Sequence, residues 1–184
     1  PNWIPDFGEA VFNPKLGEIV TGSRFFLIAY NVNIKSNDVK YSKEIGEVLR
    51  ESGYAKRDEN GNIIKVDGKA IKVPGRLKEV KGMGVALEKY NLTQVSMNLT
   101  NYNVTPMHVA FEEAKKEAER LGVEVNGSEI VGLVPLEAML QAGRFYTNGK
   151  ETNEKKLVEA AVENLGLSAL HPFKPEEKII EYMI

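Results

Sequence analysis

The chain has 184 residues, 42% of them apolar and 27% charged, so it is long enough for one hydrophobic core and too short for two independent ones. The formal charge of -2 provides no positive surplus to hold a polyanion, which argues against nucleic acid as the main partner. Cysteine is absent, which excludes disulfides and thiolate chemistry and is ordinary in a reducing compartment, so we expect a cytoplasmic protein.

The first 24 residues contain several prolines and glycines and follow no regular period. We expect an irregular linker here, and its opening at Pro1 is typical of a segment cut from a longer protein. No apolar run approaches the roughly 18 residues that a membrane span needs, so we expect no membrane partner. The first strand is predicted at Phe25–Ile34, where side chains alternate between an apolar and a more polar side.

A helix and a hairpin are predicted next. Ser42 can cap a helix that ends at Gly53. In the stretch 62–73, Asp67 and Gly68 separate two short alternating runs, which is a strong hairpin signal. We expect this hairpin to be peripheral.

Two antiparallel strands are then predicted at Lys81–Glu88 and Leu92–Tyr102. Thr105 as the N-cap and Pro106 at the first helical position predict a helix that ends at Gly122. A last short strand is predicted at Glu129–Pro135. Three helices are predicted after it, at Leu136–Tyr146, Asn153–Leu165 and Pro175–Tyr182. The core order βαββαβ predicts an α+β, ferredoxin-like fold with an antiparallel sheet, both crossover helices on one face, and additional C-terminal helices.

The open face of that sheet is predicted to be polar. Alternation directs one apolar set toward the helices, namely Tyr30, Val32, Val95, Met97 and Leu99. The opposite face gathers Asn31, Asn33, Gln94, Ser96, Asn98 and Thr100, and we expect Gly82, Gly84 and Ala86 to leave space beside them. Such a face could bind a heterocycle through its amides or simply be solvated, and the pattern favours neither reading.

Few residues suggest chemistry. His108 lies in the first turn of a predicted helix, where the helix dipole would lower its pKa, and His171 precedes a proline. Neither has a partner at ligand spacing, so we expect structural or surface roles and no metal site. Arg24 and the basic stretch 74–81 could meet a carboxylate or form a solvated edge. RNA-recognition modules share the topology but need aromatic platforms, which the strand at Leu92–Tyr102 does not offer.

Several strings resemble the glutamate formiminotransferase family, including the module fused to a cyclodeaminase, over nearly the whole chain. They are Asp6-Phe7-Gly8, Val20–Arg24, Phe26–Asn33, Pro74–Lys78, Leu92–Ser96, Gly127-Ser128, Val131–Leu136 and Ile179–Tyr182. Their common order and spacing make a chance match improbable.

The resemblance implies transfer of the formimino group from N-formimino-L-glutamate to N5 of tetrahydrofolate during histidine breakdown. Members have two similar subdomains with folate between their sheets, and the resemblance also implies a homodimer. Residues 25–184 would be the C-terminal subdomain and residues 1–24 the junction with the missing N-terminal one. The family's catalytic histidine belongs to that missing half, so no catalytic residue is expected here, and His108 corresponds to a helix histidine.

The resemblance also implies a folate-contacting stretch at the junction. Its residues are Gly8, Glu9, Ala10, Val11, Phe12, Asn13, Pro14, Lys15, Leu16 and Gly17. Lys15 and Leu16 stand where the fused form has a serine and a tryptophan, which puts aromatic stacking in doubt but not backbone contacts. A ferredoxin-like ligand-binding or dimerisation module without activity is the alternative, because a fold alone licenses no activity.

Overall fold

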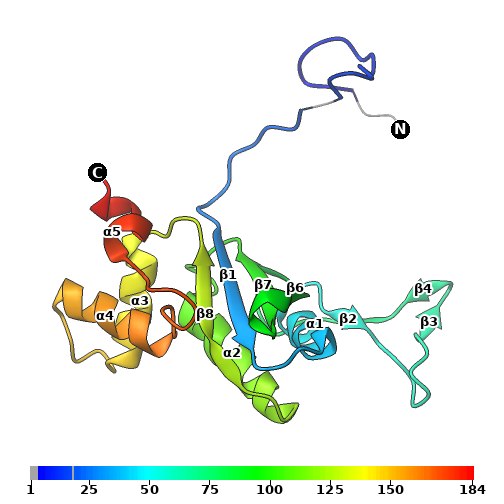
Figure 1. Ribbon diagram of the computed structural model, residues 1–184. Coiled ribbons are helices and arrows are strands. Elements are labelled where there is room, and N and C mark those ends of the chain that lie inside the picture. The colour runs from blue at the N-terminus through cyan, green and yellow to red at the C-terminus, as the bar shows by residue number, and fades with distance from the viewer. Residues whose placement is uncertain (1–3, 18) are drawn as a thin grey trace.

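The computed structural model describes residues 4–17 and 19–184. Its core is a four-stranded antiparallel sheet in the order β6-β7-β1-β8, with α1 and α2 packed on one face (Figure 1). These elements are β1 Ile28–Ile34, α1 Val39–Leu49, β6 Val80–Leu87, β7 Leu92–Leu99, α2 Met107–Arg120 and β8 Val125–Val131. The predicted ferredoxin-like arrangement is therefore confirmed.

The remaining elements lie outside the four-stranded sheet, and η1 connects β6 to β7. A hairpin arm projects beyond α1, whereas the C-terminal helices lie on the β8 side (Figure 1). They are β2 Tyr54–Ala55, β3 Lys65–Val66, β4 Lys69–Ala70, β5 Lys72–Val73, η1 Glu88–Tyr90, α3 Leu136–Tyr146, α4 Glu154–Asn164, α5 Pro175–Lys178 and η2 Ile180–Tyr182. Asp67 and Gly68 take left-handed backbone angles (φ 50° and 77°) between β3 and β4, which confirms the predicted turn.

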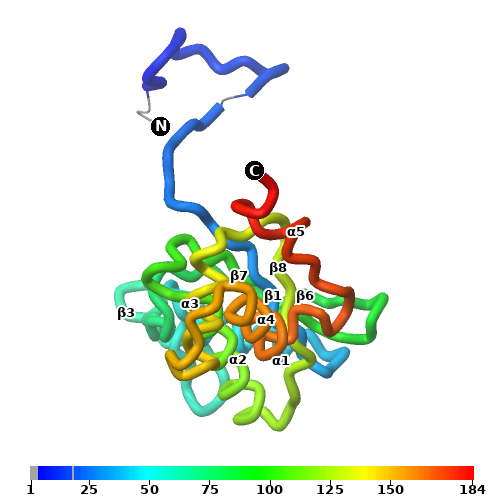
Figure 2. Tube along the Cα trace, turned by 90° about the vertical axis from the view of Figure 1, so that its left-hand side faces the viewer, coloured from blue at the N-terminus to red at the C-terminus, as the bar shows by residue number. Residues whose placement is uncertain are grey.

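Residues 4–17 and 19–27, which precede β1, stand away from the body in both views (Figures 1 and 2). Large apolar side chains among them are exposed, Phe7 to 93%. The first strand begins at Ile28 instead of Phe25, because Phe25 and Phe26 have no strand partner and are exposed. In the part of the chain that is described, no helix is both long and apolar enough to cross a bilayer.

Two predicted helix caps are wrong. Asp38 caps α1, because its Oδ1 accepts a hydrogen bond from the Lys40 N–H (3.0 Å), while Ser42 lies within the helix. Pro106 occupies the N-cap of α2, and the Thr105 hydroxyl instead donates to the Lys78 carbonyl (2.7 Å). The Thr105 hydroxyl therefore anchors the loop before β6 and does not cap the helix.

The last strand and last helix also differ from the prediction. β8 starts at Val125, four residues earlier than predicted. The register shifts beside Gly127, which has φ 80°, and this shift allows Val125 to pair with Ile34 of β1. Gly132 then turns the chain, so Val134 forms a parallel bridge with Ile179 instead of continuing β8. That bridge makes Ile179 extended, which ends α5 at Lys178.

The hydrophobic core lies between the sheet and the helices. The apolar side chains that β1 and β7 direct to this face are at most 2% exposed: Ile28, Tyr30, Val32, Ile34, Val95, Met97 and Leu99. Gly82 and Gly84 pair with Met97 and Val95 and so point to this face as well. A Cβ on Gly84 would overlap the backbone of Lys43 in α1. The expectation that these glycines leave space beside the polar side chains is therefore wrong, since α1 fills it.

Candidate functional site

The face of the sheet opposite α1 and α2 carries a continuous group of polar side chains. Residues paired across antiparallel strands share a face, so the register defines three rows. They are Asn33–Gln94–Val85, then Glu129–Asn31–Ser96–Met83, then Val131–Ala29–Asn98–Lys81. We call Asn31, Asn33, Gln94, Ser96, Asn98 and Glu129 the polar face. Five of the six predicted residues share one side, and Glu129 joins them from β8. Thr100 lies beyond the end of β7, and its hydroxyl donates to the Glu79 carbonyl (3.0 Å).

A hydrogen-bonded amide cluster joins the first two rows, with Gln94 at its centre. The Nε2 of Gln94 donates to Oδ1 of Asn33 (2.8 Å) and to Oε2 of Glu129 (3.1 Å). The Oε1 of Gln94 accepts from Nδ2 of Asn31 (3.3 Å). Side chains from β1, β7 and β8 are thus fixed relative to one another, which is the kind of order that a binding surface requires.

Burial varies along the polar face. Asn33 is 0% and Gln94 4% exposed, whereas Asn98 at the other end is exposed. The reading of a wholly solvated face is therefore wrong for Asn33 and Gln94, which the domain itself covers. Tyr90 Oη and His171 Nε2 are 2.6 Å apart, so the segment after α4 reaches the turn between β6 and β7 at the buried end. His171 thus has a structural contact.

One polar atom of the cluster is unsatisfied. Within the described residues, the Nδ2 of Asn33 is buried and has no hydrogen-bond partner. A buried donor without a partner costs about 1–3 kcal/mol, so native proteins rarely retain one without a reason. The cluster is therefore one acceptor short at its buried end.

Residues 29–184 match the family described as "Formiminotransferase domain". The chain belongs to this family. It is 43% identical to a formimidoyltransferase-cyclodeaminase of Mus musculus, in an alignment that covers 99% of this chain and 31% of that protein. It is 47% identical to a formimidoyltransferase-cyclodeaminase of Dictyostelium discoideum, over 99% of this chain and 32% of that protein. A glutamate formimidoyltransferase of Thermoplasma acidophilum is 35% identical, over 88% of this chain and 46% of that protein. The chain thus spans about a third to a half of these relatives.

The stretch Gly8–Gly17 precedes the residues that match the family and stands away from the sheet (Figures 1 and 2). It forms a turn of its own, in which Oδ1 of Asn13 accepts the N–H groups of Lys15 (2.9 Å) and Leu16 (3.0 Å). The Gly17 N–H donates to the Asn13 carbonyl (2.7 Å). Gly8 and Gly17 have positive φ (88° and 67°), which other residues adopt only with strain. The turn therefore has a defined local shape that its glycines permit.

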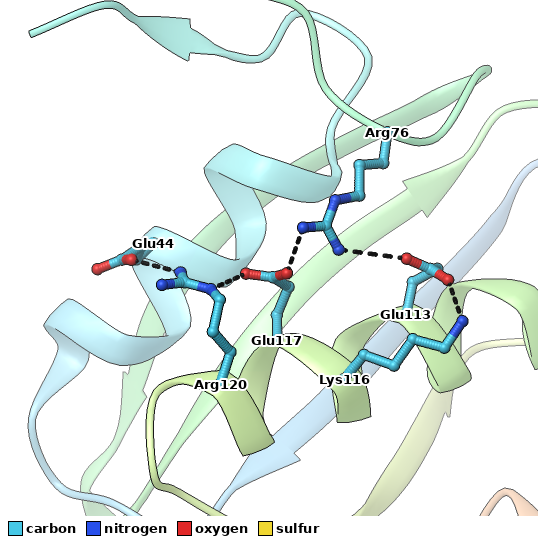
Figure 3. Close-up of polar contacts among 6 residues, drawn as sticks. All are labelled: Glu44, Arg76, Glu113, Lys116, Glu117 and Arg120. Atoms are coloured by element: carbon cyan, nitrogen blue, oxygen red, sulfur yellow. Dashed lines mark hydrogen bonds and ion pairs between the residues drawn. The ribbon is translucent and has the colours of Figure 1, made fainter.

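A cavity of about 510 Å³ lies on the opposite side of the domain, between α1, α2 and the base of the hairpin arm. Four of the charged residues that line it, Glu44, Arg76, Glu117 and Arg120, belong to one network of ion pairs (Figure 3). Glu117, 2% exposed, accepts from Arg76 (2.6 Å) and Arg120 (2.8 Å). Arg76 also contacts Glu113 (3.4 Å), and Arg120 contacts Glu44 (2.6 Å). Arg76, predicted as a possible carboxylate ligand, is thus already engaged with glutamates of its own chain.

His108 is not arranged as a general base. Its ring stacks on Phe145 of α3 with centroids 4.5 Å apart, and burial lowers its pKa. Its Nδ1 is buried without a hydrogen-bond partner in the described residues, so no carboxylate orients the ring. Among those residues there is also no group of three or more histidine, aspartate or glutamate side chains suited to a metal ion. Of the sites described, only the polar face combines an open position with unspent hydrogen-bonding capacity.

Proposed function

We propose that this formiminotransferase domain provides the folate-binding sheet of an enzyme that moves the formimino group from N-formimino-L-glutamate to N5 of tetrahydrofolate, in histidine breakdown. The observation that carries the proposal is the ordered amide cluster on the open face of a family member, where Asn31 is partly exposed and Asn98 is exposed to a ligand. The names of the relatives support the reaction. Tetrahydrofolate is a co-substrate, and its heterocycle presents several donors and acceptors to such a face.

The role of this domain in the reaction is to position the substrates. Attack of the folate N5 amine on the formimino carbon needs a base to remove a proton, and holding the two reactants together lowers the barrier further. His171 is bound to Tyr90, and His108 lies on α2, behind the sheet. In this proposal the base comes from the N-terminal subdomain, as the family resemblance implies.

The proposal extends to the partners of the domain. Residues 25–184 form the C-terminal subdomain, and residues 1–24 run to the N-terminal subdomain. Gly8–Gly17 contacts folate at that junction, where its exposed apolar side chains, such as Phe12, gain a partner. A homodimer in the cytoplasm completes the proposal.

Asn98→Leu tests the proposed face, because Asn98 is exposed and its replacement breaks no buried hydrogen bond. In the full-length enzyme we expect this variant to unfold at the wild-type temperature and to raise the KM for tetrahydrofolate by roughly 5- to 100-fold. Asn37→Leu, which changes an exposed asparagine before α1, is the control and should leave KM unchanged. Wild-type protein that makes no 5-formimino-tetrahydrofolate would disprove the activity, and an unchanged KM in Asn98→Leu would disprove the site.

A further inference from the structure

Glu129 is the acidic side chain of the polar face, and only part of its hydrogen-bonding capacity is used. Its Oε2 accepts from Gln94, whereas no protein donor among the described residues contacts its Oε1. The residue is half-buried in the middle row and also borders a hollow of about 150 Å³ at the β8 edge. Lys178 borders the same hollow, but no ion pair joins the two side chains. A carboxylate oxygen is therefore available to a ligand on this face.

The row that contains Glu129 fits one flat heterocycle. Glu129, Asn31 and Ser96 lie side by side on three strands, which at about 4.8 Å per strand form a polar strip roughly 10 Å long. Ala29 in the next row is small, and Met83 and Val131, at 59% and 53% exposed, provide apolar surface at either side. A planar ring can thus direct its polar edge to the strip while its faces contact apolar side chains.

The two halves of a folate differ sharply in what they would present to this strip. The pterin ring has an N3–H and a 2-amino group next to each other, which form a two-donor fork that a carboxylate accepts bidentately. Its neighbouring carbonyl O4 is an acceptor that the second N–H of the Asn31 amide can reach. The p-aminobenzoyl-glutamate half instead ends in carboxylates, which Glu129 would repel.

We propose that Glu129 recognises the pterin ring of tetrahydrofolate by accepting its N3–H and 2-amino hydrogens, and so determines which half of the folate lies on this sheet. The proposal rests on the proposed function and adds an orientation to it. N5, the atom that receives the formimino group, belongs to the same ring and is therefore held at the sheet, facing the N-terminal subdomain.

The test uses the full-length enzyme with three ligands: tetrahydrofolate, 6-methyltetrahydropterin, which has no tail, and p-aminobenzoyl-L-glutamate, which has no pterin. Glu129→Gln keeps an acceptor for Gln94 but removes the charge and one of the two acceptors for the fork. We expect it to weaken binding of the first two ligands about tenfold or more and to leave the third unchanged. Glu124→Gln removes an exposed carboxylate that pairs with Lys35, and it should change none of the three affinities.

The outcomes separate this inference from the proposed function. Wild-type protein that binds no tetrahydrofolate would disprove both. Wild-type binding with no loss in Glu129→Gln would disprove the role of Glu129 alone. A loss for p-aminobenzoyl-L-glutamate without a loss for 6-methyltetrahydropterin would mean that the folate lies in the opposite orientation and would also overturn the inference.

Discussion

His108 illustrates how burial controls the ionisation of a single side chain. The ring lies between α2 and Phe145, and loss of solvent lowers its pKa although nearby Glu112 acts in the opposite direction. The native protein therefore binds a proton at His108 less readily than the unfolded chain does. The contribution of His108 to the folding stability is therefore fully present above the pKa of the unfolded chain, about 6.5. This contribution falls as the pH drops below that value toward the lowered native pKa.

His108→Phe should remove this part of the pH dependence. Phenylalanine keeps the stacking surface against Phe145 and replaces a buried nitrogen that has no partner, so stability at pH 8 should be equal or higher. Between pH 8 and pH 5.5, the melting temperature should fall less in the variant than in the wild type. Parallel curves for the two proteins would show that His108 does not titrate with folding.

At this scale the sequence predicts which side of a strand a residue occupies but not how deeply it is buried. Asn31, Asn33 and Gln94 could be assigned to one face because strands alternate with a period of two. The burial of Asn33 could not be predicted, because it is a tertiary property of a side chain whose hydrogen-bond partner, Gln94, lies 61 positions later in the chain. The sequence does not identify Glu129 as a member of the polar face. The face of the sheet on which Glu129 lies depends on its pairing with Asn31, and the alternation within one strand does not define that pairing.

Among the elements, α1 and β6 pack so closely that a Cβ at Gly84 would overlap the backbone of α1. Gly84 has backbone atoms of Lys43 where its Cβ would be, whereas a Cβ on Gly82 would lie 3.3 Å from the Gly46 carbonyl and otherwise near flexible side chains. The two glycines are two residues apart on the same face of β6, so they differ mainly in the room that α1 leaves.

Gly84→Ala should therefore destabilise the domain by about 1–3 kcal/mol, because α1 must move away from the sheet. Gly82→Ala is the matched control and should cost less than about 1 kcal/mol, since alanine also suits a strand better than glycine. Urea unfolding of both variants measures the difference. Equal costs for the two would contradict the closer approach of α1 to Gly84.

Elements were predicted more reliably than their ends. α3 has the predicted bounds, since its apolar period is regular from Leu136 to Tyr146. Errors arose where two side chains compete for one role, as when Asp38 caps α1 a turn before Ser42 could. They also arose where tertiary pairing overrides a local pattern, as at the register shift beside Gly127.

For the molecule as a whole, the charge network of Glu117 joins parts that are distant in sequence. Arg76, at the base of the hairpin arm, contacts the Glu117 carboxylate on α2 (Figure 3). Arg120 contacts the same carboxylate and also Glu44, which lies on α1. The carboxylate is buried, while both arginines are about half exposed. The cost of disrupting the network therefore depends on which side is removed.

Replacing Arg76 and Arg120 together with alanine should destabilise the protein by about 3–5 kcal/mol, because it leaves the Glu117 carboxylate buried and unpaired. Glu117→Gln should cost less, since the freed guanidinium groups can turn to water. Arg144→Ala breaks an exposed pair with Glu137 and should cost at most about 1 kcal/mol. If chemical denaturation gave the double variant and Arg144→Ala similar free energies of unfolding, the network would be no more than surface charge.

The position of β1 has a consequence for the order in which this protein is made. β1 lies in the middle of the sheet, between β7 and β8, yet both neighbours follow it in the chain with a helix and the hairpin arm in between. During synthesis on the ribosome, the backbone groups of β1 therefore have no strand partner, and its apolar side chains stay exposed, until β7 emerges. The other edge of β1 stays unpaired until β8 emerges. Such distant pairings fold slowly, so the nascent chain has a long interval in which β1 needs protection from aggregation.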